Sequence, residues 1–232
     1  MASDDVARVR AHYAERGARY AERFADDRPE VRYAWSRLTV RIQAALDGAG
    51  LDLASARVLD VGCGGGGLMA WLLERGVQPA RLLGVDLVVP RLHQARRHAP
   101  AAGLALADGA RLPLRDGRLD VVLALTSLSS MPSLAMRRDA AAQMLRVLRP
   151  GGVALCYEFV HKNPLNKYTV TLRPRQLAAL FEGARVEIHR MSLHPWLVRA
   201  LWPFGPRVLD AVEGIGALRS HLLAVVKKPT PR

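Results

Sequence analysis

Two patterns of hydrophobic and polar positions divide the chain near residue 57. Before that point, apolar side chains recur at helical spacing in two stretches, the second of which covers residues 31–46. Two aspartates and Pro29 separate the stretches, as is typical of a break between helices. The pattern therefore predicts that residues 1–47 are helical.

Beyond residue 57, short apolar runs alternate with stretches of helical periodicity. Runs without a polar side are typical of parallel strands that helices cover on both faces. The strands predicted in this way are Val58–Val61, Leu82–Val85, Leu104–Ala107, Val121–Leu125 and Val153–Phe159. The helices predicted between them are Gly66–Arg75, Arg91–His98 and Asp139–Leu148. This alternation indicates a doubly wound sheet.

The last third of the chain continues the alternation less regularly. After a polar loop, the pattern predicts a helix near Arg173–Phe181, a strand near Ala184–Met191 and a final strand at Leu222–Val226. The stretch 195–216 is rich in tryptophan, phenylalanine and leucine and is interrupted by Pro203 and Pro206. It could cover a substrate, pack as ordinary core or, with two arginines close by, make a peripheral membrane contact.

The composition fits one packed α/β domain, since the 232 residues are 50% hydrophobic and 24% charged. No apolar run reaches the roughly 18 residues that a membrane span needs. The polar N-terminus also lacks the apolar core of a secretory signal. We therefore expect a cytoplasmic protein in which Cys63 and Cys156, in apolar contexts without metal-ligand spacing, are inert thiols.

The net charge of +13 could attract nucleic acid, anionic lipid or an acidic substrate. Only four of the basic residues are lysines, and the arginines are scattered through an alanine-rich sequence without aromatic-interleaved basic runs. This distribution does not favour a nucleic-acid partner.

A glycine-rich segment, VLDVGCGGGG at residues 58–67, gives the sharpest chemical signal. Here a predicted strand turns directly into a helix, and glycines let a ligand approach the main chain closely. The glycines alone satisfy both the dinucleotide and the methyltransferase spacing. Asp60, two residues before the first glycine, suits a cationic ligand end better than a pyrophosphate.

Further aspartates follow the next predicted strands. Asp86 ends the second strand, where a carboxylate can accept hydrogen bonds from ribose hydroxyls. Asp108 is predicted to end the third strand, where an amine-bearing adenine edge would lie, and Asp120 to begin the fourth. Asp60, Asp86 and Asp108 therefore predict a ligand site at the carboxyl ends of the first three strands.

The order of these motifs resembles the class I S-adenosylmethionine-dependent methyltransferases. The resemblance covers about residues 58–152 and comprises VLDVGCGGGG, GVD, D-x-x-x-L-P, LDVV and an LRPGG turn before the fifth strand. In that family the first acid and the glycines hold the methionine end of S-adenosylmethionine, the second acid the ribose and the third the adenine. The cofactor-binding residues implied here are Asp60, Gly62, Gly64, Gly66, Asp86, Asp108 and Gly109, together with Leu125 and Tyr20.

Pattern and resemblance together predict an α/β fold with a Rossmann-like, doubly wound, mostly parallel seven-stranded sheet, an antiparallel last strand and N-terminal helices. Residues 1–50 are expected to form a helical extension or lid, with Tyr13 and Tyr20 either facing the cofactor or packing on the sheet. Residues 51–232 would form the cofactor-binding core, with an acceptor-covering insertion near 192–217.

The candidate catalytic bases are Glu158, near the end of the fifth predicted strand, and His161, just after it, where the site crevice usually lies. Glu158 could instead be a buried, hydrogen-bonded carboxylate at the strand end, and His161 could be a solvated loop histidine. Ser129 and Ser130 stand where many relatives carry a histidine-containing segment, so a base from that place is not expected. Their hydroxyls could line a pocket or cap the next helix.

Several reaction types lack their motifs. The chain has no D/N-P-P-Y/F segment after the fourth strand, no suitably placed nucleophilic cysteine and no acidic cluster for magnesium there. We therefore predict metal-free methyl transfer to an oxygen or nitrogen of a small metabolite such as a natural product, a sugar or a lipid-linked intermediate. An RNA methyltransferase and a non-catalytic S-adenosylmethionine-binding module remain alternatives, and the sequence does not determine the oligomeric state.

Overall fold

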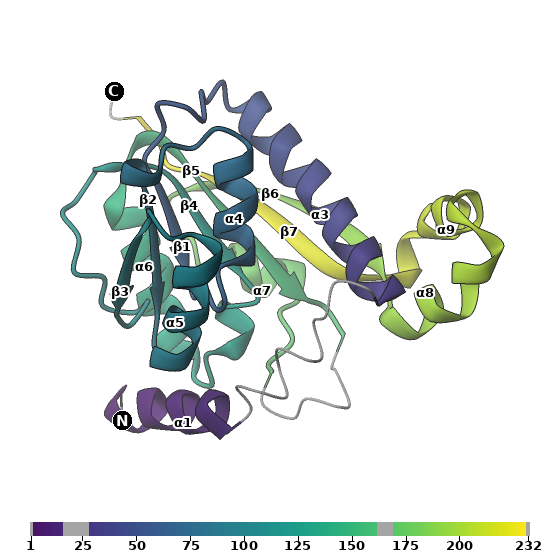
Figure 1. The fold of residues 1–232 in the computed structure, drawn as a ribbon, viewed down its shortest axis with the longest axis horizontal. Coiled ribbons are helices and arrows are strands. Elements are labelled where there is room, and N and C mark those ends of the chain that lie inside the picture. Colours follow the sequence, from purple (N-terminus) through teal and green to yellow (C-terminus); the bar gives the residue numbers. More distant parts are fainter. Residues whose placement is uncertain (1, 16–27, 162–168, 231–232) are drawn as a thin grey trace.

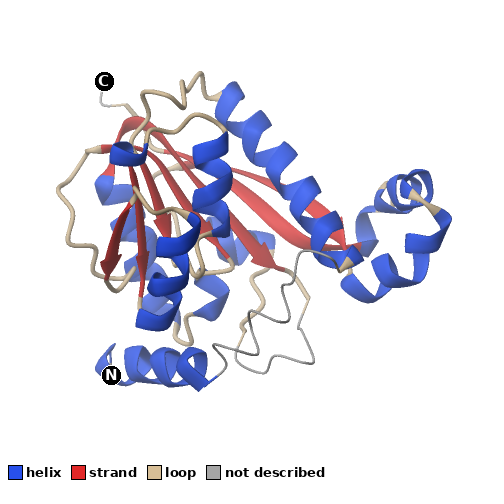
Figure 2. Ribbon diagram, in the orientation of Figure 1, coloured by secondary structure: helices blue, strands red, loops and turns tan. Residues whose placement is uncertain are grey.

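A computed structural model describes the whole chain except residues 1, 16–27, 162–168 and 231–232. Seven strands form one sheet in the order β3-β2-β1-β4-β5-β7-β6 (Figures 1 and 2). Neighbouring strands from β3 to β5 are parallel, whereas β7 runs antiparallel to both β5 and β6. The strands are β1 (Val58–Val61), β2 (Leu82–Asp86), β3 (Gly103–Leu106), β4 (Leu119–Leu125), β5 (Leu148–Phe159), β6 (Arg185–Leu193) and β7 (Arg219–Lys227). This mixed sheet confirms the predicted fold class.

Helices cover both faces of the sheet. Those of the described segments are α1 (Ala2–Glu15), α3 (Pro29–Gly48), α4 (Gly67–Glu74), α5 (Val89–His98), α6 (Leu134–Val147), α7 (Pro174–Ala178), α8 (Pro195–Leu201) and α9 (Pro206–Glu213). Short 3₁₀ turns are η1 (Pro79–Arg81), η2 (Leu128–Ser130), η3 (Trp202–Phe204) and η4 (Gly216–Leu218).

Alternate side chains of the central strands belong to two separate hydrophobic cores. On one face, Val121 and Leu123 of β4 pack with α3 and α4. On the other face, Val122 and Ala124 pack with α6 and α7. Because period-two alternation divides each strand between two apolar layers, the strands appear in the sequence as continuous apolar runs. α3 contributes Ile42 and Leu46, both fully buried, to the first core.

Residues 195–218 connect β6 to β7 as a small helical unit, which we call the C-terminal lobe. It contains α8, η3, α9 and η4. Val198 and Leu209 form a local core with Leu193 of β6 and Tyr33 at the start of α3. Figure 1 shows the lobe projecting from the body of the molecule beside this end of α3.

The structure moves some predicted boundaries. α6 begins at Leu134 rather than Asp139, because the Ser133 hydroxyl caps it by accepting the Met136 N–H at 3.1 Å. The LRPGG segment was predicted as a turn before the fifth strand but belongs to β5, with an irregular register opposite β4. A bulge of this kind admits the glycine at position 151, whose φ is +74°.

Among the described helices, none combines the length and the apolar character required to cross a bilayer.

Candidate active site

A cavity of about 540 Å³ opens at the carboxyl ends of β1, β2 and β4. This is the edge of an open α/β sheet where ligands usually bind. The glycine-rich turn after β1 forms one wall, and the ends of β2 and β4 contribute Asp86 and Leu125. Val9 and Tyr13 of α1 and Trp35 of α3 approach from outside the sheet.

The turn after β1 depends on Gly62. Its φ is +73°, and a Cβ at this position would overlap the Ser127 hydroxyl. The N–H groups of Gly62 and Cys63 both donate to the Val85 carbonyl of β2, at 2.8 and 3.0 Å. The Ser127 hydroxyl donates to the Val61 carbonyl at 2.6 Å. Backbone and hydroxyl groups thus fix the turn between β2 and β4, and a larger residue would break this arrangement.

Gly66 has a different place from the other predicted glycines. Gly62 and Gly64 line the cavity, whereas Gly66 is absent from its walls. With φ at +83°, its Cβ would lie only 2.8 Å from the Ala95 Cα. Gly66 therefore allows the start of α4 to pack against α5, and its predicted role as a direct cofactor contact stays a prediction.

Asp60 lies in the cavity wall but is only 2% exposed. Burial, and secondarily the nearby Asp86 carboxylate, raise the pKa of Asp60 to about 8. A buried acid of this kind favours a ligand that carries a positive charge, because a cation would stabilise the carboxylate form.

Asp86 reinforces the turn from the tip of β2. Its carboxylate accepts the N–H of Gly64 and that of Val88, each at 2.9 Å. The guanidinium of Arg91 lies 3.9 Å from the same carboxylate. Each carboxylate oxygen has further lone pairs and can therefore accept additional hydrogen bonds from a ligand in the cavity.

Asp108 does not end the third strand, as the sequence suggested, because β3 stops at Leu106. Asp108 and Gly109 lie in the following turn and line the cavity. The Asp108 carboxylate accepts the Ala110 N–H at 2.9 Å, a local bond that competes with continuation of the strand. A Cβ on Gly109 would lie 2.8 Å from the Val61 side chain. The turn thus packs closely against the end of β1.

Thr126, directly after β4, is a site residue that no sequence pattern indicated. Thr126 lines the cavity with a φ of +55°, a conformation that is strained for a side chain branched at Cβ. Its N–H donates to the Tyr157 carbonyl at 2.7 Å, and its own carbonyl accepts the Ser130 hydroxyl at 2.7 Å. A left-handed threonine has no sequence signature, since tertiary contacts impose it.

The sequence left open whether Ser129 and Ser130 line a pocket or cap the next helix. Ser130 lines the cavity, whereas Ser129 is buried. The side-chain cap of α6 comes from Ser133. A hydroxyl of the serine segment therefore faces the site.

α1 closes part of the cavity through Tyr13. The Tyr13 hydroxyl lies 2.5 Å from the Ser130 hydroxyl, and the Arg91 guanidinium lies over the Tyr13 ring, 4.4 Å from its centroid. These contacts connect α1 to η2, which follows β4, and to α5, which follows β2. The other predicted lid residue, Tyr20, lies outside the described residues. Arg91 was missed because the sequence alone does not show that α1 crosses this part of the sheet.

Glu158 is fully buried near the end of β5 and is not among the cavity-lining residues. Its carboxylate accepts the N–H groups of Leu128 and Ser129, at 2.8 and 3.0 Å. Burial raises the pKa of Glu158 to about 7, although these hydrogen bonds and Arg137 oppose the rise. This geometry favours a positioning role, in which Glu158 holds η2 and thereby Ser130 in place.

His161 follows β5 as an exposed residue and is likewise not part of the cavity wall. It immediately precedes residues that the structure does not describe. Its predicted role as a base therefore stays a prediction.

Comparisons with known proteins find similarity to methyltransferases. Residues 59–156 match a family described as methyltransferase domain. A fatty-acid O-methyltransferase of Mycolicibacterium smegmatis is 33% identical over 167 residues, which are 71% of this chain and 55% of that protein. Phthiotriol/phenolphthiotriol dimycocerosates methyltransferase 1 of Mycobacterium ulcerans is 32% identical over 132 residues, or 56% of this chain and 47% of that protein. The chain thus spans about half the length of these curated relatives.

Solved structures share the fold at lower identity. A TehB-like SAM-dependent methyltransferase from Corynebacterium glutamicum is 18% identical and superimposes with a TM-score of 0.58, over 95% of this chain and 97% of its own. Geranyl diphosphate C-methyltransferase from Streptomyces coelicolor, solved with S-adenosyl-L-homocysteine, is 16% identical with a TM-score of 0.61, over 82% of this chain and 77% of its own. At such identities the likeness concerns the fold.

Proposed function

Because the chain belongs to the class I S-adenosylmethionine-dependent methyltransferases, we propose that it transfers the methyl group of S-adenosylmethionine to an oxygen or nitrogen of a small metabolite. The observation that carries the proposal is the pair of carboxylates at the glycine turn. Asp60 is buried with a raised pKa, and Asp86 holds the turn from the next strand. This pair suits a ligand with a cationic end and a sugar with two hydroxyls.

The carboxylates and glycines that line the cavity would each contact one part of S-adenosylmethionine. Asp60, Gly62 and Gly64 would hold the methionine end, and Asp86 would accept hydrogen bonds from the ribose hydroxyls. Asp108, the Gly109 backbone and Leu125 would surround the adenine. Tyr20 is retained in the same set as a prediction from the sequence.

The protein's contribution to the reaction would be orientation. Bound S-adenosylmethionine supplies an activated methyl group, so the chain need not create a leaving group. Alignment of two reactants in a pocket can contribute roughly 7–11 kcal/mol. Thr126 and Ser130, fixed by their hydrogen bonds at the end of β4, would form the border of the acceptor space. His161 is the proposed base for an acceptor that must lose a proton.

Relatives support a small acceptor. Their names refer to fatty acids, phthiotriol dimycocerosates and a malonyl-acyl carrier protein. We accordingly propose an acceptor from the natural-product, sugar or lipid-linked classes and not a nucleic acid. The cytoplasmic location expected from the sequence stays part of this proposal.

The test is transfer of labelled methyl from S-adenosylmethionine to a panel of fatty acids, polyketide and sugar metabolites and tRNA. We expect one labelled small product, identified by mass spectrometry, and background label in the RNA. Labelling confined to the RNA would contradict a small-metabolite acceptor and would indicate an RNA methyltransferase. The same assay is repeated with cell extracts as the source of acceptors. Donor binding with no labelled product from either the panel or the extracts would support a non-catalytic S-adenosylmethionine-binding module.

The placement of the donor is tested separately with Asp86→Ala. Loss of charged hydrogen bonds, worth about 1.5–3 kcal/mol each, should weaken donor binding by on the order of a hundredfold in calorimetric titration. Asp47→Ala, at the exposed end of α3, is the matched control and should bind donor normally. Circular dichroism checks that both variants fold. Unchanged donor affinity in Asp86→Ala would contradict the proposed ribose site.

A further inference from the structure

The C-terminal lobe presents large apolar side chains to solvent. Trp196 and Phe204 are 60% and 69% exposed, and Trp202 and Ile215 are exposed as well. In the described part of the chain, every aromatic residue among the exposed large hydrophobics lies in this lobe. Single exposed apolar residues are ordinary, but several on one small unit mark an interaction surface.

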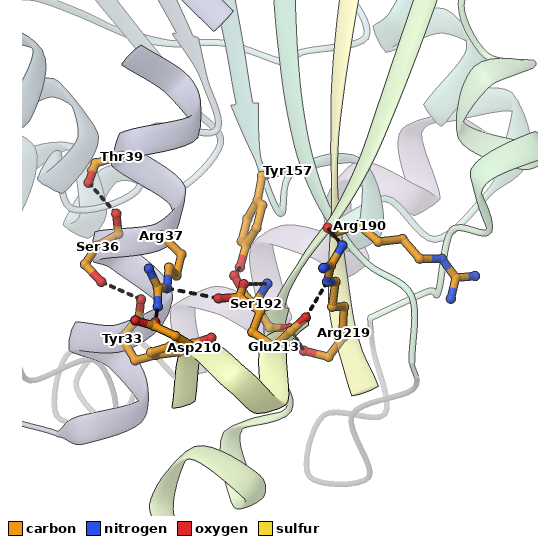
Figure 3. Close-up of polar contacts among 11 residues, drawn as sticks. Tyr33, Ser36, Arg37, Thr39, Tyr157, Arg190, Ser192, Asp210, Glu213 and Arg219 are labelled. Carbon is orange, nitrogen blue, oxygen red and sulfur yellow. Dashed lines mark hydrogen bonds and ion pairs between the residues drawn. The ribbon is translucent and has the colours of Figure 1, made fainter. Parts of the chain in front are cut away.

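The lobe and the adjoining start of α3 carry an excess of positive charge. Residues 28–37 and 190–219 contain seven arginines and three acids. Arginines neutralise all three acids: Arg199 pairs with Glu30 at 2.6 Å, and Arg37 pairs with both Asp210 and Glu213 (Figure 3). The arginines therefore outnumber the acids by four.

Three of these arginines are exposed and free to face a partner. Arg32 lies in the first turns of α3, Arg207 opens α9, and Arg190 extends from β6 away from the polar network in Figure 3. Arg32 also lines a cavity of about 430 Å³ between α3 and the lobe, beside the Trp202 ring. Positive and aromatic groups thus occur together on the lobe and on the parts of α3 and β6 beside it.

The position of the lobe suits contact with an extended surface. It joins the end of β6 to the start of β7, and β7 begins opposite the end of β5 through the pair Phe159 and His221. This is the same edge of the sheet at which the donor cavity opens. Because the lobe projects from the body (Figure 1), a flat surface can reach it without colliding with the sheet.

We propose that the C-terminal lobe docks on an anionic lipid surface, with Trp196 and Phe204 in the headgroup region and Arg32 and Arg207 facing anionic headgroups. Tryptophan is enriched at membrane interfaces because its ring has both an apolar body and a polar edge. Arginine reaches headgroups with a long apolar stem. A second copy of the chain fits less well, since two molecules of net charge +13 repel each other.

This docking would bring the donor cavity close to the lipid surface. An acceptor with a lipid tail could then reach the site from the bilayer, a consequence that rests on the proposed function. The docking itself does not depend on catalysis and is measured without donor or acceptor.

The experiment is flotation of the full chain with vesicles of phosphatidylcholine alone and of phosphatidylcholine with about 30% phosphatidylglycerol, at about 0.1 M salt. We expect at least about tenfold stronger binding to the anionic vesicles, which declines as salt is raised. Equal binding to both vesicle types, or binding to neither, would overturn the proposal.

Two variants separate the apolar from the charged contribution. Trp196→Ser with Phe204→Ser, and Arg32→Glu with Arg207→Glu, should each weaken anionic-vesicle binding by about tenfold or more. The controls make the same changes elsewhere: Val40→Ser with Leu134→Ser at other exposed apolar positions, and Arg115→Glu with Arg118→Glu in the loop before β4. The controls should bind vesicles as the unmodified protein does.

Further readouts keep the result specific to the lobe. Donor affinity must be unchanged in every lobe variant, which shows that the fold and the donor cavity are intact. Lobe variants that float as well as the controls would refute the docking surface. Sedimentation velocity tests the alternative of self-association. If the unmodified protein self-associates but does not bind vesicles, and Trp196→Ser with Phe204→Ser abolishes the self-association, the surface binds a second copy of the chain instead.

Discussion

Asp60 is the buried acid of the donor cavity, and its burial destabilises the charged form of the carboxyl group. A carboxyl group that titrates near 4 in the unfolded chain is buried in the folded protein and titrates at about 8. The acid binds a proton more tightly in the folded state, so the free energy of unfolding falls as pH rises between these two values. A cationic ligand end would relieve this cost by stabilising the carboxylate.

We therefore predict a pH dependence that Asp60→Asn removes. Without donor, the unfolding free energy of the unmodified protein should fall by up to about 4 kcal/mol relative to that of Asp60→Asn between pH 4 and pH 7, because other buried groups such as Glu158 titrate alike in both proteins. Denaturant unfolding at several pH values measures both. Parallel profiles for the two proteins would show that Asp60 is not the group responsible.

The same residue should govern donor affinity. At pH values below the Asp60 pKa of about 8, the carboxyl group is protonated, and a donor bound there through its cationic end would displace that proton. Affinity should therefore rise as pH increases from about 6 towards 8, and Asp60→Asn should bind donor weakly without that rise. Calorimetric titration in buffers of different ionisation enthalpy would detect the released proton.

His161 differs from the donor residues because it is exposed and lies outside the cavity wall. If it acts as the base, His161→Ala should lower turnover by about 10²–10⁴-fold and leave donor affinity unchanged. Steady-state rates and donor titration on the same preparation make the comparison. His93→Ala, which removes another exposed histidine outside the cavity wall, tests whether the loss is specific. Full activity in His161→Ala would leave this histidine without a catalytic role.

At the scale of elements, two contacts determine how the cavity is bordered. Glu158 of β5 holds the N–H groups of η2, which in turn presents Ser130 to the site. Tyr13 then connects α1 to that serine and to Arg91. α1 is thus attached to the site itself through polar and cation–π contacts.

Substitutions of Tyr13 should separate these contacts. Tyr13→Phe removes the hydroxyl but keeps the ring over Arg91, so donor dissociation should accelerate by only about threefold. Tyr13→Ala also removes the cation–π contact and should accelerate it by about tenfold. Stopped-flow displacement of labelled donor gives both rates. Equal rates in both variants and the unmodified protein would show that α1 does not retain the donor.

At the scale of the whole molecule, donor binding should stabilise a fold whose site lies between several strands. The cavity is bordered by the ends of β1, β2 and β4 and by α1, so unfolding of the sheet destroys it. A ligand that binds the folded state alone stabilises it by about 2.7 kcal/mol at a hundredfold excess over Kd.

The expected result is a rise in melting temperature of about 5–10 °C with saturating S-adenosylmethionine. Differential scanning fluorimetry measures it, with NADH at equal concentration as the comparison. A shift with NADH and none with S-adenosylmethionine would contradict the assignment of the cavity.

The amino-acid sequence by itself determined the strands, their helical connections and the order of the donor motifs. Strands covered on both faces are continuous apolar runs, and the turn after β1 requires glycine at Gly62, whose φ is +73°. Both signals are local in the chain and are therefore visible in its letters. The boundaries of α6 and β5 were misjudged because a serine cap and a strand irregularity decide them.

Only the tertiary structure decided which side chains share the cavity. Tyr13, Arg91 and Ser130 meet from three separate elements, and Thr126 adopts a left-handed backbone that contacts distant in sequence impose. The structure likewise directs Glu158 into the protein rather than into the cavity. Such contacts depend on how the chain packs over long sequence separations, and no local pattern of residues encodes them.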